Sequence, residues 1–484
     1  MMKPKKLFAW VFKLIFTLLF ITALSIPLGA FDFGKSPLTL QKKKYAFTGV
    51  SIITLNTSPL DFIADTTLVT ETSRFVSEKK TVLINDGKIV SINDVETEID
   101  EGYEVIDGEG KFLMAGLMDM HTHLFDRSDL LLYLANGVTT VRNMMGMSMH
   151  LRWREQVING EYPGPTIYTA SPTLNNGKNT GPFHKVVKTA EQAKKAVRKY
   201  AEKGYDFIKI YDGINHEQLI AIAEEANRLG LTIAGHPSYE VGIDTLVSSG
   251  MVSIEHAEEV LQALLNYKYN EGRSREIARK IRENNIYFTP TLAVYKRIVD
   301  ATLKGEKIYD EDSLYFINPL MRTIGKKQLK DWVELEDNSN VRLKYDILQW
   351  IVRDFREEGV SILLGTDTGP NLTIPGFTLH EEIALMIESG LTTYEVLYSG
   401  TVASAKALGM EHAKGAVEIG MDADLILLEK NPLLDVSTLK VPAGVMKDGV
   451  WYDKSSLTIL LEEAKDHASG FRTFGRLLGQ IIGK

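Results

Sequence analysis

The chain contains no cysteine among its 484 residues. This absence excludes disulfides, thiolate metal ligands, a cysteine nucleophile and a lipid-modified N-terminal cysteine. An excess of basic residues is also lacking, since 55 Lys and Arg stand against 63 Asp and Glu and give a net charge of -8. Because phosphate binding needs a basic face, we expect no nucleic-acid partner. Any bound metal must be held by histidine, carboxylate or a less usual ligand.

The chain starts with a basic segment followed by an apolar one. Lys3, Lys5 and Lys6 precede a stretch of which residues 14–31 carry no charge. This pattern predicts that residues 1–31 are a signal peptide or an N-terminal membrane anchor. Either reading implies an exported protein that is periplasmic, at the cell surface or membrane-anchored. Whether the segment is cleaved stays open.

Two β-rich regions flank the middle of the chain. Residues 44–115 and 413–455 alternate apolar and polar side chains and turn at pairs such as Asp107-Gly108. We expect them to pair into one β-sandwich module built from both ends of the chain.

Residues 456–484 are predicted to form a helical tail. Helical spacing places Phe471, Phe474, Leu478 and Ile481 on one apolar face. Such a face is typical of docking, here against the catalytic body or against a partner subunit of a homo-oligomer. Surface attachment to a membrane is a weaker alternative.

Residues 116–412 alternate apolar runs with helical patterns that end in glycine. Strand followed by helix, repeated eight times, predicts an α/β fold of the (β/α)8 TIM barrel type. About seventy residues separate the seventh and eighth predicted strands, which is far beyond an ordinary connection. We expect this excursion, around residues 293–358, to be partly helical and to form a lid or a pocket wall.

Ionisable side chains fall at the carboxyl ends of the predicted strands, where barrel active sites lie. Residues two apart in a strand point to the same side, so the histidines of "MDMHTHL" can face one interior. The full set consists of His121, His123, Lys209, His236, His256 and Asp367.

Each of these residues has a structural alternative when it is taken singly. An isolated pair such as His121 and His123 is more often unremarkable than metal-binding. Asp367 could cap a turn. Lys209 fits such an alternative least well, because an unpaired ammonium in the apolar run "FIKIY" is costly to bury.

The segments "GLMDMHTHL", "GVTTVRN", "FIKIYDG", "AGHP", "SIEHA", "FTPTL", "GTDTG" and "GMDADLILLEKNPL" carry a resemblance. Together they resemble the amidohydrolase superfamily, and within it the imidazolonepropionase-related group that includes Xaa-Pro dipeptidases. The resemblance covers roughly residues 44–455. It implies the barrel and the composite sheet module, and it places the chain in the binuclear branch.

The resemblance implies two divalent metal ions and a carboxylated, bridging Lys209. His121, His123, Lys209 and Asp367 would hold one ion, and Lys209, His236 and His256 the other. Nitrogen and oxygen ligands suit Zn best, with Mn, Fe or Co as alternatives. A hydroxide that bridges the metals would attack a carbonyl, and Asp367 would be catalytic by moving its proton to the leaving nitrogen.

Four further residues are candidates for substrate binding. Tyr211 lies two residues beyond Lys209 and can point to the same interior. His184 follows a Gly/Asn-rich loop, Arg142 could hold a carboxylate or form a structural ion pair, and Tyr295 starts the long excursion.

The first functional hypothesis is hydrolysis of a C–N amide bond in a small molecule, either a dipeptide or an N-acyl amino acid. Opening of a cyclic amide or imidazolone is the alternative, and Lys209 argues against it because ring-opening relatives usually lack the bridging lysine. Lactone or phosphotriester hydrolysis would also suit such a metal pair. A non-catalytic, membrane-tethered binding protein is the alternative outside the enzymes, and the complete ligand set argues against it.

Overall fold

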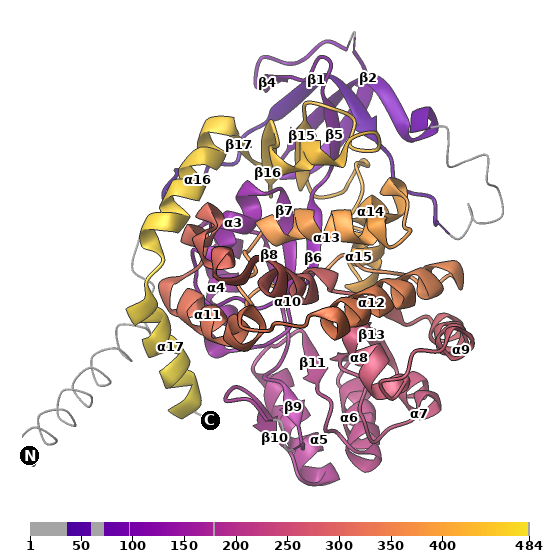
Figure 1. The fold of residues 1–484 in the computed structure, drawn as a ribbon. Helices are drawn as coiled ribbons and strands as arrows, with labels where there is room; N and C mark the ends of the chain where they lie inside the picture. Colours follow the sequence, from indigo (N-terminus) through magenta and orange to yellow (C-terminus); the bar gives the residue numbers. More distant parts are fainter. Residues whose placement is uncertain (1–35, 60–71, 96, 178–179, 483–484) are drawn as a thin grey trace, which may run out of the picture.

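The computed structural model describes residues 36–59, 72–95, 97–177 and 180–482 (Figure 1). The predicted signal or anchor segment at residues 1–31 lies outside these ranges. Within them, no helix combines the length and apolar character that crossing a bilayer requires.

The middle of the chain forms a ring of parallel strands. Its members are β6 (Leu117–Thr122), β7 (Val138–Asn143), β8 (Thr166–Thr169), β11 (Phe207–Ile210), β12 (Thr232–Gly235), β13 (Met251–Glu255), β14 (Tyr287–Thr289) and the extended segment 361–368. Parallel bridges join Ala170 to Phe207, Phe288 to Ile362 and Thr122 to Thr368, and so complete the ring. The predicted eight-stranded barrel is confirmed.

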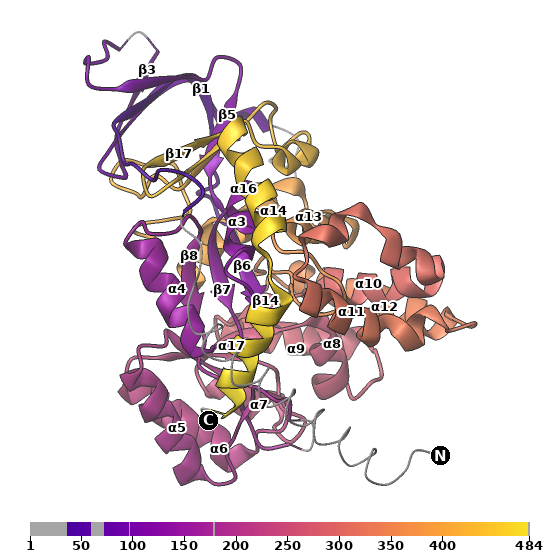
Figure 2. The ribbon, with the colours of Figure 1, turned by 90° about the vertical axis from the view of Figure 1, so that its left-hand side faces the viewer.

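Helices follow the strands as the sequence pattern predicts (Figure 2). They are α3 (Asp129–Ala135), α4 (Ser148–Ile158), α5 (Ala190–Glu202), α6 (His216–Arg228), α7 (Ile243–Ser248), α9 (Glu271–Glu283) and α13 (Phe377–Glu388), with the shorter α14 (Thr393–Ser399) and α15 (Val402–Ala407) after α13. Asn215 and Gln218 form a capping box at the start of α6. Gly204 and Gly230 lie just past α5 and α6 with φ of +80° and +70°, a backbone conformation that glycine adopts at little cost.

The predicted excursion between the last two strands is almost entirely helical. It contains α10 (Leu292–Lys304), the 3-10 turns η4 (Gly305–Asp310) and η5 (Asp312–Phe316), α11 (Pro319–Val333) and α12 (Ser339–Glu357). It has a small apolar core of its own, to which Ile308, Leu314 and Leu329 belong. Val294, Tyr295 and Leu348 from α10 and α12 line a cavity that His236 and Asp367 also border. The expected role as a pocket wall agrees with this placement.

Short elements extend the strand ends around the mouth of the barrel. Strands β9 (Leu174–Asn175) and β10 (Lys185–Val186) follow β8, and α8 (Ala257–Glu259) with the π-turn η3 (Val260–Leu264) follows β13.

Strands from both chain ends form the sheet module at the top of Figure 1. They are β1 (Tyr45–Ile53), β2 (Val76–Asn85), β3 (Lys88–Asp94), β4 (Glu104–Asp107), β5 (Phe112–Ala115), β15 (Leu425–Leu428), β16 (Gly444–Lys447) and β17 (Val450–Asp453), with the 3-10 turns η2 (Thr72–Phe75) and η6 (Val436–Lys440) beside them. The two ends meet where β5 pairs antiparallel with β15. Side chains such as Phe47, Ile84, Leu425 and Met446 share one buried core.

The tail consists of α16 (Lys454–His467) and α17 (Gly470–Ile482), which run along one side of the barrel (Figure 2). It docks against the body of the protein, but the predicted apolar face does not make this contact. Docking of that face on a partner subunit stays a prediction. Phe471, Phe474 and Ile481 remain about 40% exposed, whereas Thr473 and Arg476 are buried.

The buried face of α17 contains the apolar Leu477 and the polar side chains of Thr473 and Arg476, which contact a carboxylate of the barrel. Arg476 Nη2 and Thr473 Oγ1 each donate to Asp126 Oδ2 at 2.7 Å, and Asn318 Nδ2 donates to the same oxygen at 2.9 Å. Asp126 lies in the loop that follows β6. One buried carboxylate therefore joins the barrel mouth, the long excursion and the tail.

Candidate metal centre

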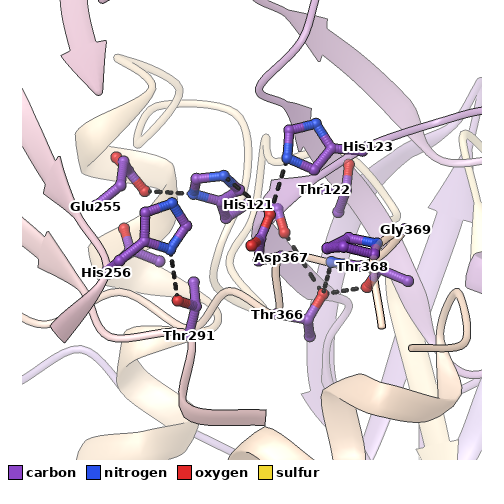
Figure 3. A network of polar contacts seen from close by, with 12 residues as sticks. His121, Thr122, His123, Glu255, His256, Thr291, Thr366, Asp367, Thr368 and Gly369 are labelled. Atoms are coloured by element: carbon purple, nitrogen blue, oxygen red, sulfur yellow. Dashed lines mark hydrogen bonds and ion pairs between the residues drawn. The ribbon is translucent and has the colours of Figure 1, made fainter. Parts of the chain in front are cut away.

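The six ionisable residues at the strand ends come together at the mouth of the barrel, and Figure 3 shows the part around Asp367. Ring centroids lie 5.4 Å apart for His121 and His123, 4.5 Å for His121 and His256, and 4.7 Å for His236 and His256. We call these six residues the histidine cluster: His121, His123, Lys209, His236, His256 and Asp367. Their convergence follows from the parallel ring, which brings the carboxyl ends of all strands to one face.

His121 is oriented by a buried carboxylate on a neighbouring strand. Its Nδ1 lies 2.8 Å from Glu255 Oε2, while Arg142 Nη2 donates to the other oxygen of Glu255 at 2.7 Å. With Nδ1 donating to a carboxylate, Nε2 presents its lone pair, which is the arrangement that metal-ligating histidines adopt. His121 Nε2 is buried and has no hydrogen-bond partner among the described residues.

His256 is oriented in the same way by Thr291, since its Nδ1 lies 2.7 Å from Thr291 Oγ1. Both residues have positive φ, +71° for His256 and +50° for Thr291, and Asp367 follows with +53°. Non-glycine residues rarely adopt this region, and strain of this kind gathers at functional sites. Three consecutive barrel positions therefore hold strained residues that face one point.

Asp367 lies close to His121, in β6, and to His123, just past the end of that strand. Its Oδ1 is 2.8 Å from His123 Nε2 and 3.4 Å from His121 Nε2. Burial acts to raise the pKa of Asp367, but the hydrogen bond from His123 and the nearby cations hold that pKa below its ordinary value. His121, His256 and Asp367 each offer one ligand atom within 4.8 Å of the others.

Lys209 and His236 bring unsatisfied atoms to the same place. Lys209 is 2% exposed, and its Nζ and His236 Nδ1 are both buried without hydrogen-bond partners among the described residues. Burial lowers the pKa of Lys209 to about 8, which increases the share of neutral amine. Gly235 lets His236 take its place, because a Cβ there would lie 2.1 Å from the carbonyl oxygen of Ile210.

The donor set fits divalent ions. Buried polar atoms nearly always have partners, so orphaned nitrogens on His121, Lys209 and His236 within one cluster point to ligands beyond the protein itself. Burial lowers the pKa of His256 to about 3 and that of His121 and His236 well below the usual range. Neutral imidazole is the form that binds a metal. The chemistry of the cluster therefore suits a metal centre with nitrogen and oxygen ligands.

The predicted substrate residues occupy different places. The Tyr211 ring lies 4.0 Å from His236 and 4.6 Å from His184 by ring centroids, so His184 touches the cluster through Tyr211. Tyr211 and Tyr295 line a cavity of about 150 Å³ beside Asp367.

Arg142 does not line that cavity. It is 1% exposed, and its guanidinium is occupied by Glu255, Ser253, Thr289 and the carbonyl of Met120. Of the two readings of the sequence, the geometry favours the structural ion pair over the carboxylate-binding site.

Several residues around the site were not singled out from the sequence. Asp119 accepts hydrogen bonds from His121 N and from Thr366, which ties β6 to the eighth strand position. Its two-residue spacing from His121 could have revealed it. Glu255 also had a signal, as a charged residue inside the apolar strand "MVSIE". Thr291 and Glu382 carried none, because the positive φ of Thr291 and the bonds from Leu292 N and Ala293 N to Glu382 exist only in the fold.

A second group of carboxylates lies in the sheet module and contains Asp422, Asp424 and Asp448. Lysines neutralise it: Lys414 Nζ is 2.9 Å from Asp422, Lys447 Nζ is 3.2 Å from Asp424, and Lys88 Nζ is 2.6 Å from Asp422. Burial acts to lower the pKa of Lys414, but the aspartates raise it above its ordinary value. We call these six residues the lysine–aspartate cluster: Lys88, Lys414, Asp422, Asp424, Lys447 and Asp448. Its own cations satisfy it, so it has no need of a metal.

The strand ends of this (β/α)8 barrel bring four histidines, a buried lysine and an aspartate together. This combination is typical of a class of metal-dependent barrel proteins. The family model for "Amidohydrolase family" matches residues 112–452, which is well over half of the chain. The chain belongs to the amidohydrolase family.

Individual relatives are distant. Ochratoxinase of Aspergillus niger is 22% identical over 353 residues, which cover 64% of this chain and 64% of that protein. Imidazolonepropionase of Kosmotoga olearia is 22% identical over 389 residues, covering 75% of this chain and 87% of that protein. A crystal structure of a Xaa-Pro dipeptidase with methionine bound in its active site is 21% identical and superposes with a TM-score of 0.65, covering 85% of this chain and all of the other. The predicted family and fold are thus confirmed.

Proposed function

We propose that the protein is a metal-dependent hydrolase of C–N amide bonds, acting on a dipeptide or an N-acyl amino acid. The observation that carries the proposal is the set of buried nitrogens on His121, Lys209 and His236 around Asp367 that lack a hydrogen-bond partner among the residues described. The similarity to ochratoxinase and to a Xaa-Pro dipeptidase supports it.

His121, His123, Lys209 and Asp367 would hold one ion, and Lys209, His236 and His256 would hold a second. When bound, two divalent ions would lower the pKa of a water molecule and act as a Lewis acid on the substrate carbonyl. The neutral amine of Lys209, favoured by burial, is the form that reacts with carbon dioxide to give a carbamate. Carboxylation would turn a buried, unpaired cation into an oxygen donor.

The chain itself supplies orientation and proton transfer. Glu255 and Thr291 fix the rings of His121 and His256. Asp367 Oδ1, held by His123, is placed to accept a proton from the attacking water and to give it to the leaving nitrogen. Tyr211 borders the same cavity and can donate its hydroxyl to the substrate, because burial raises its pKa and keeps it protonated.

The test uses the full-length protein loaded with Zn, measured for metal content and for hydrolysis of a dipeptide library. We expect chelation to abolish turnover and Zn to restore it. Lys209→Ala is expected to lose both turnover and part of the metal, whereas Lys203→Ala, at an exposed lysine just past α5, should change neither. With carbon-13-labelled bicarbonate, the wild type should show a carbamate carbon signal that Lys209→Ala lacks. A Lys209→Ala variant with intact turnover would overturn the proposal.

Cyclic amide hydrolysis is the second candidate, since imidazolonepropionase is among the relatives. The buried Lys209 argues against it in this chain, because a buried amine without a hydrogen-bond partner among the described residues suits a bridge between two metal ions. If a cyclic amide or an imidazolone were cleaved faster than every dipeptide, cyclic amide hydrolysis would become the first candidate. Metal binding without turnover of any substrate would favour a binding protein instead.

A further inference from the structure

Two adjacent glutamates border the cavity at the candidate metal centre. Glu258 and Glu259 end the short helix α8, which starts immediately after His256. Both line the same cavity of about 150 Å³ as Tyr295, His236 and Asp367. Together with Asp367 they make three carboxylates in the wall of this cavity, so each needs a group that balances its charge.

Glu258 is balanced within the protein. Lys344 from α12 forms an ion pair with it, and Gln262 Nε2 donates to Glu258 Oε1 at 2.8 Å. The same Lys344 ammonium lies 4.9 Å from the centre of the Tyr295 ring, so it is held between two groups. The ammonium of Lys344 is therefore held by Glu258 and acts on the neighbouring carboxylate of Glu259 only at longer range.

Glu259 has no such partner. Its side chain is 13% exposed, and its nearest titratable partner is His236, whose Nδ1 lies 3.4 Å from Glu259 Oε1. No Lys or Arg nitrogen of the described residues lies within 4.0 Å of it. The hydroxyl of Tyr239 reaches Oε2 only at 3.5 Å and donates to Gln262 at 2.7 Å. Lys209 and Lys344 act on Glu259 only at longer range. A largely buried carboxylate without a cation in direct contact is costly, so a cationic group of a ligand beside it would be stabilised.

We propose that Glu259 selects substrates that carry an ammonium group beside the scissile amide, so that dipeptides with a free amino terminus are preferred to N-acyl amino acids. This rests on the proposed hydrolase function. In a dipeptide the ammonium is one carbon away from the carbonyl that must lie by Asp367, and Glu259 borders that same cavity. An N-acyl group would instead bury the carboxylate against a neutral group.

The apolar part of the wall fits the rest of such a substrate. Val294 and Leu348 line the cavity together with the ring of Tyr295. They offer contact to a side chain, while the ion pair with Glu259 would fix which end of the substrate enters. Specificity of this kind is strong, because a substrate that lacks the ammonium leaves the buried carboxylate unpaired.

The experiment compares Glu259→Gln with Glu258→Gln in the full-length, Zn-loaded protein. The best-cleaved dipeptide of the library is measured beside its N-acetyl derivative. We expect wild-type kcat/KM to favour the free amine by roughly 30-fold or more, and Glu259→Gln to remove that preference mainly through KM. Glu258→Gln should keep the preference within about threefold, because its carboxylate is already paired.

Binding gives a readout that does not depend on turnover. L-leucine and N-acetyl-L-leucine are titrated into the protein by calorimetry, and Glu259→Gln should weaken only the first, by roughly tenfold or more. If Glu259→Gln and Glu258→Gln weakened L-leucine binding equally, only the overall negative charge at the barrel mouth would matter, and the proposal would be overturned. Loss of Zn from Glu259→Gln would make Glu259 a metal ligand and overturn it as well.

The two proposals fail in different ways. If the wild type cleaves N-acyl amino acids as fast as dipeptides, the selectivity is wrong while the hydrolase function stands. If the Zn-loaded wild type cleaves no amide at all, the hydrolase function is wrong, whatever the calorimetry shows.

Discussion

The histidine cluster at the barrel mouth and the lysine–aspartate cluster in the sheet module both bury several ionisable groups. In the sheet module each aspartate has a lysine partner, and Lys414 and Lys447 are themselves buried. At the barrel mouth, buried nitrogens of His121, Lys209 and His236 have no hydrogen-bond partner within the described part of the chain. Paired charge needs nothing more from outside the chain, whereas unpaired donors require a ligand. The number of acidic residues alone would not have told the two clusters apart.

The largest effect is expected when a lysine is removed from the lysine–aspartate cluster of the sheet module. Lys414→Met removes one of the two lysine partners of Asp422 and of Asp424 and leaves three carboxylates of the cluster against two lysines. The free energy of unfolding should fall by about 3 to 5 kcal/mol, because buried negative charge is then left uncompensated. Denaturant unfolding measures it. Zn content per folded chain should stay at the wild-type level, and a loss of Zn would show that the two clusters are not independent.

A smaller effect is expected at the barrel mouth. Glu255→Gln keeps the size of the side chain but removes the carboxylate that orients His121, so Zn affinity should fall by roughly 10- to 100-fold. Competition with a chromophoric chelator measures it. Glu258→Gln is the matched control, since Glu258 pairs with Lys344 rather than with a histidine. Equal Zn affinity in Glu255→Gln and wild type would remove Glu255 from the metal centre.

The smallest effect is a dependence on acid. Burial acts to raise the pKa of Asp424, but Lys447 and Lys414 outweigh it and hold that pKa at about 2 against an ordinary 3.8. A carboxylate whose pKa is lower in the folded than in the unfolded protein stabilises the fold at pH values above the unfolded-state pKa. This stabilisation is lost as the pH falls towards the folded-state pKa. Between pH 3.8 and 2, wild type should therefore lose about 2 kcal/mol more than Asp424→Asn. Parallel losses in both proteins would contradict this assignment.

The sequence pattern predicted the parts of the fold that depend on short-range periodicity. Alternation and terminal glycines located the barrel strands, and strand ends then gave the positions of His236, His256 and Asp367. What the pattern missed depends on contacts between distant segments. Glu255, Arg142 and His121 come together from three different strands. Helix α17 buries Thr473 and Arg476 because Asp126 lies beneath them. Helical spacing identified the apolar side of that helix and could not show which side would be covered.

The carboxylate of Asp126 has a consequence for the order of folding. Its hydrogen-bond partners Asn318, Thr473 and Arg476 lie 192, 347 and 350 residues away along the chain. The entropy cost of closing a loop grows with the separation of the two residues along the chain, so contacts between residues so far apart form slowly. Asp126 lies three residues beyond His123 in the loop after β6. We expect this loop to reach its native conformation only after the excursion and the tail have docked. The mouth of the barrel is then among the last parts of the protein to take its final shape.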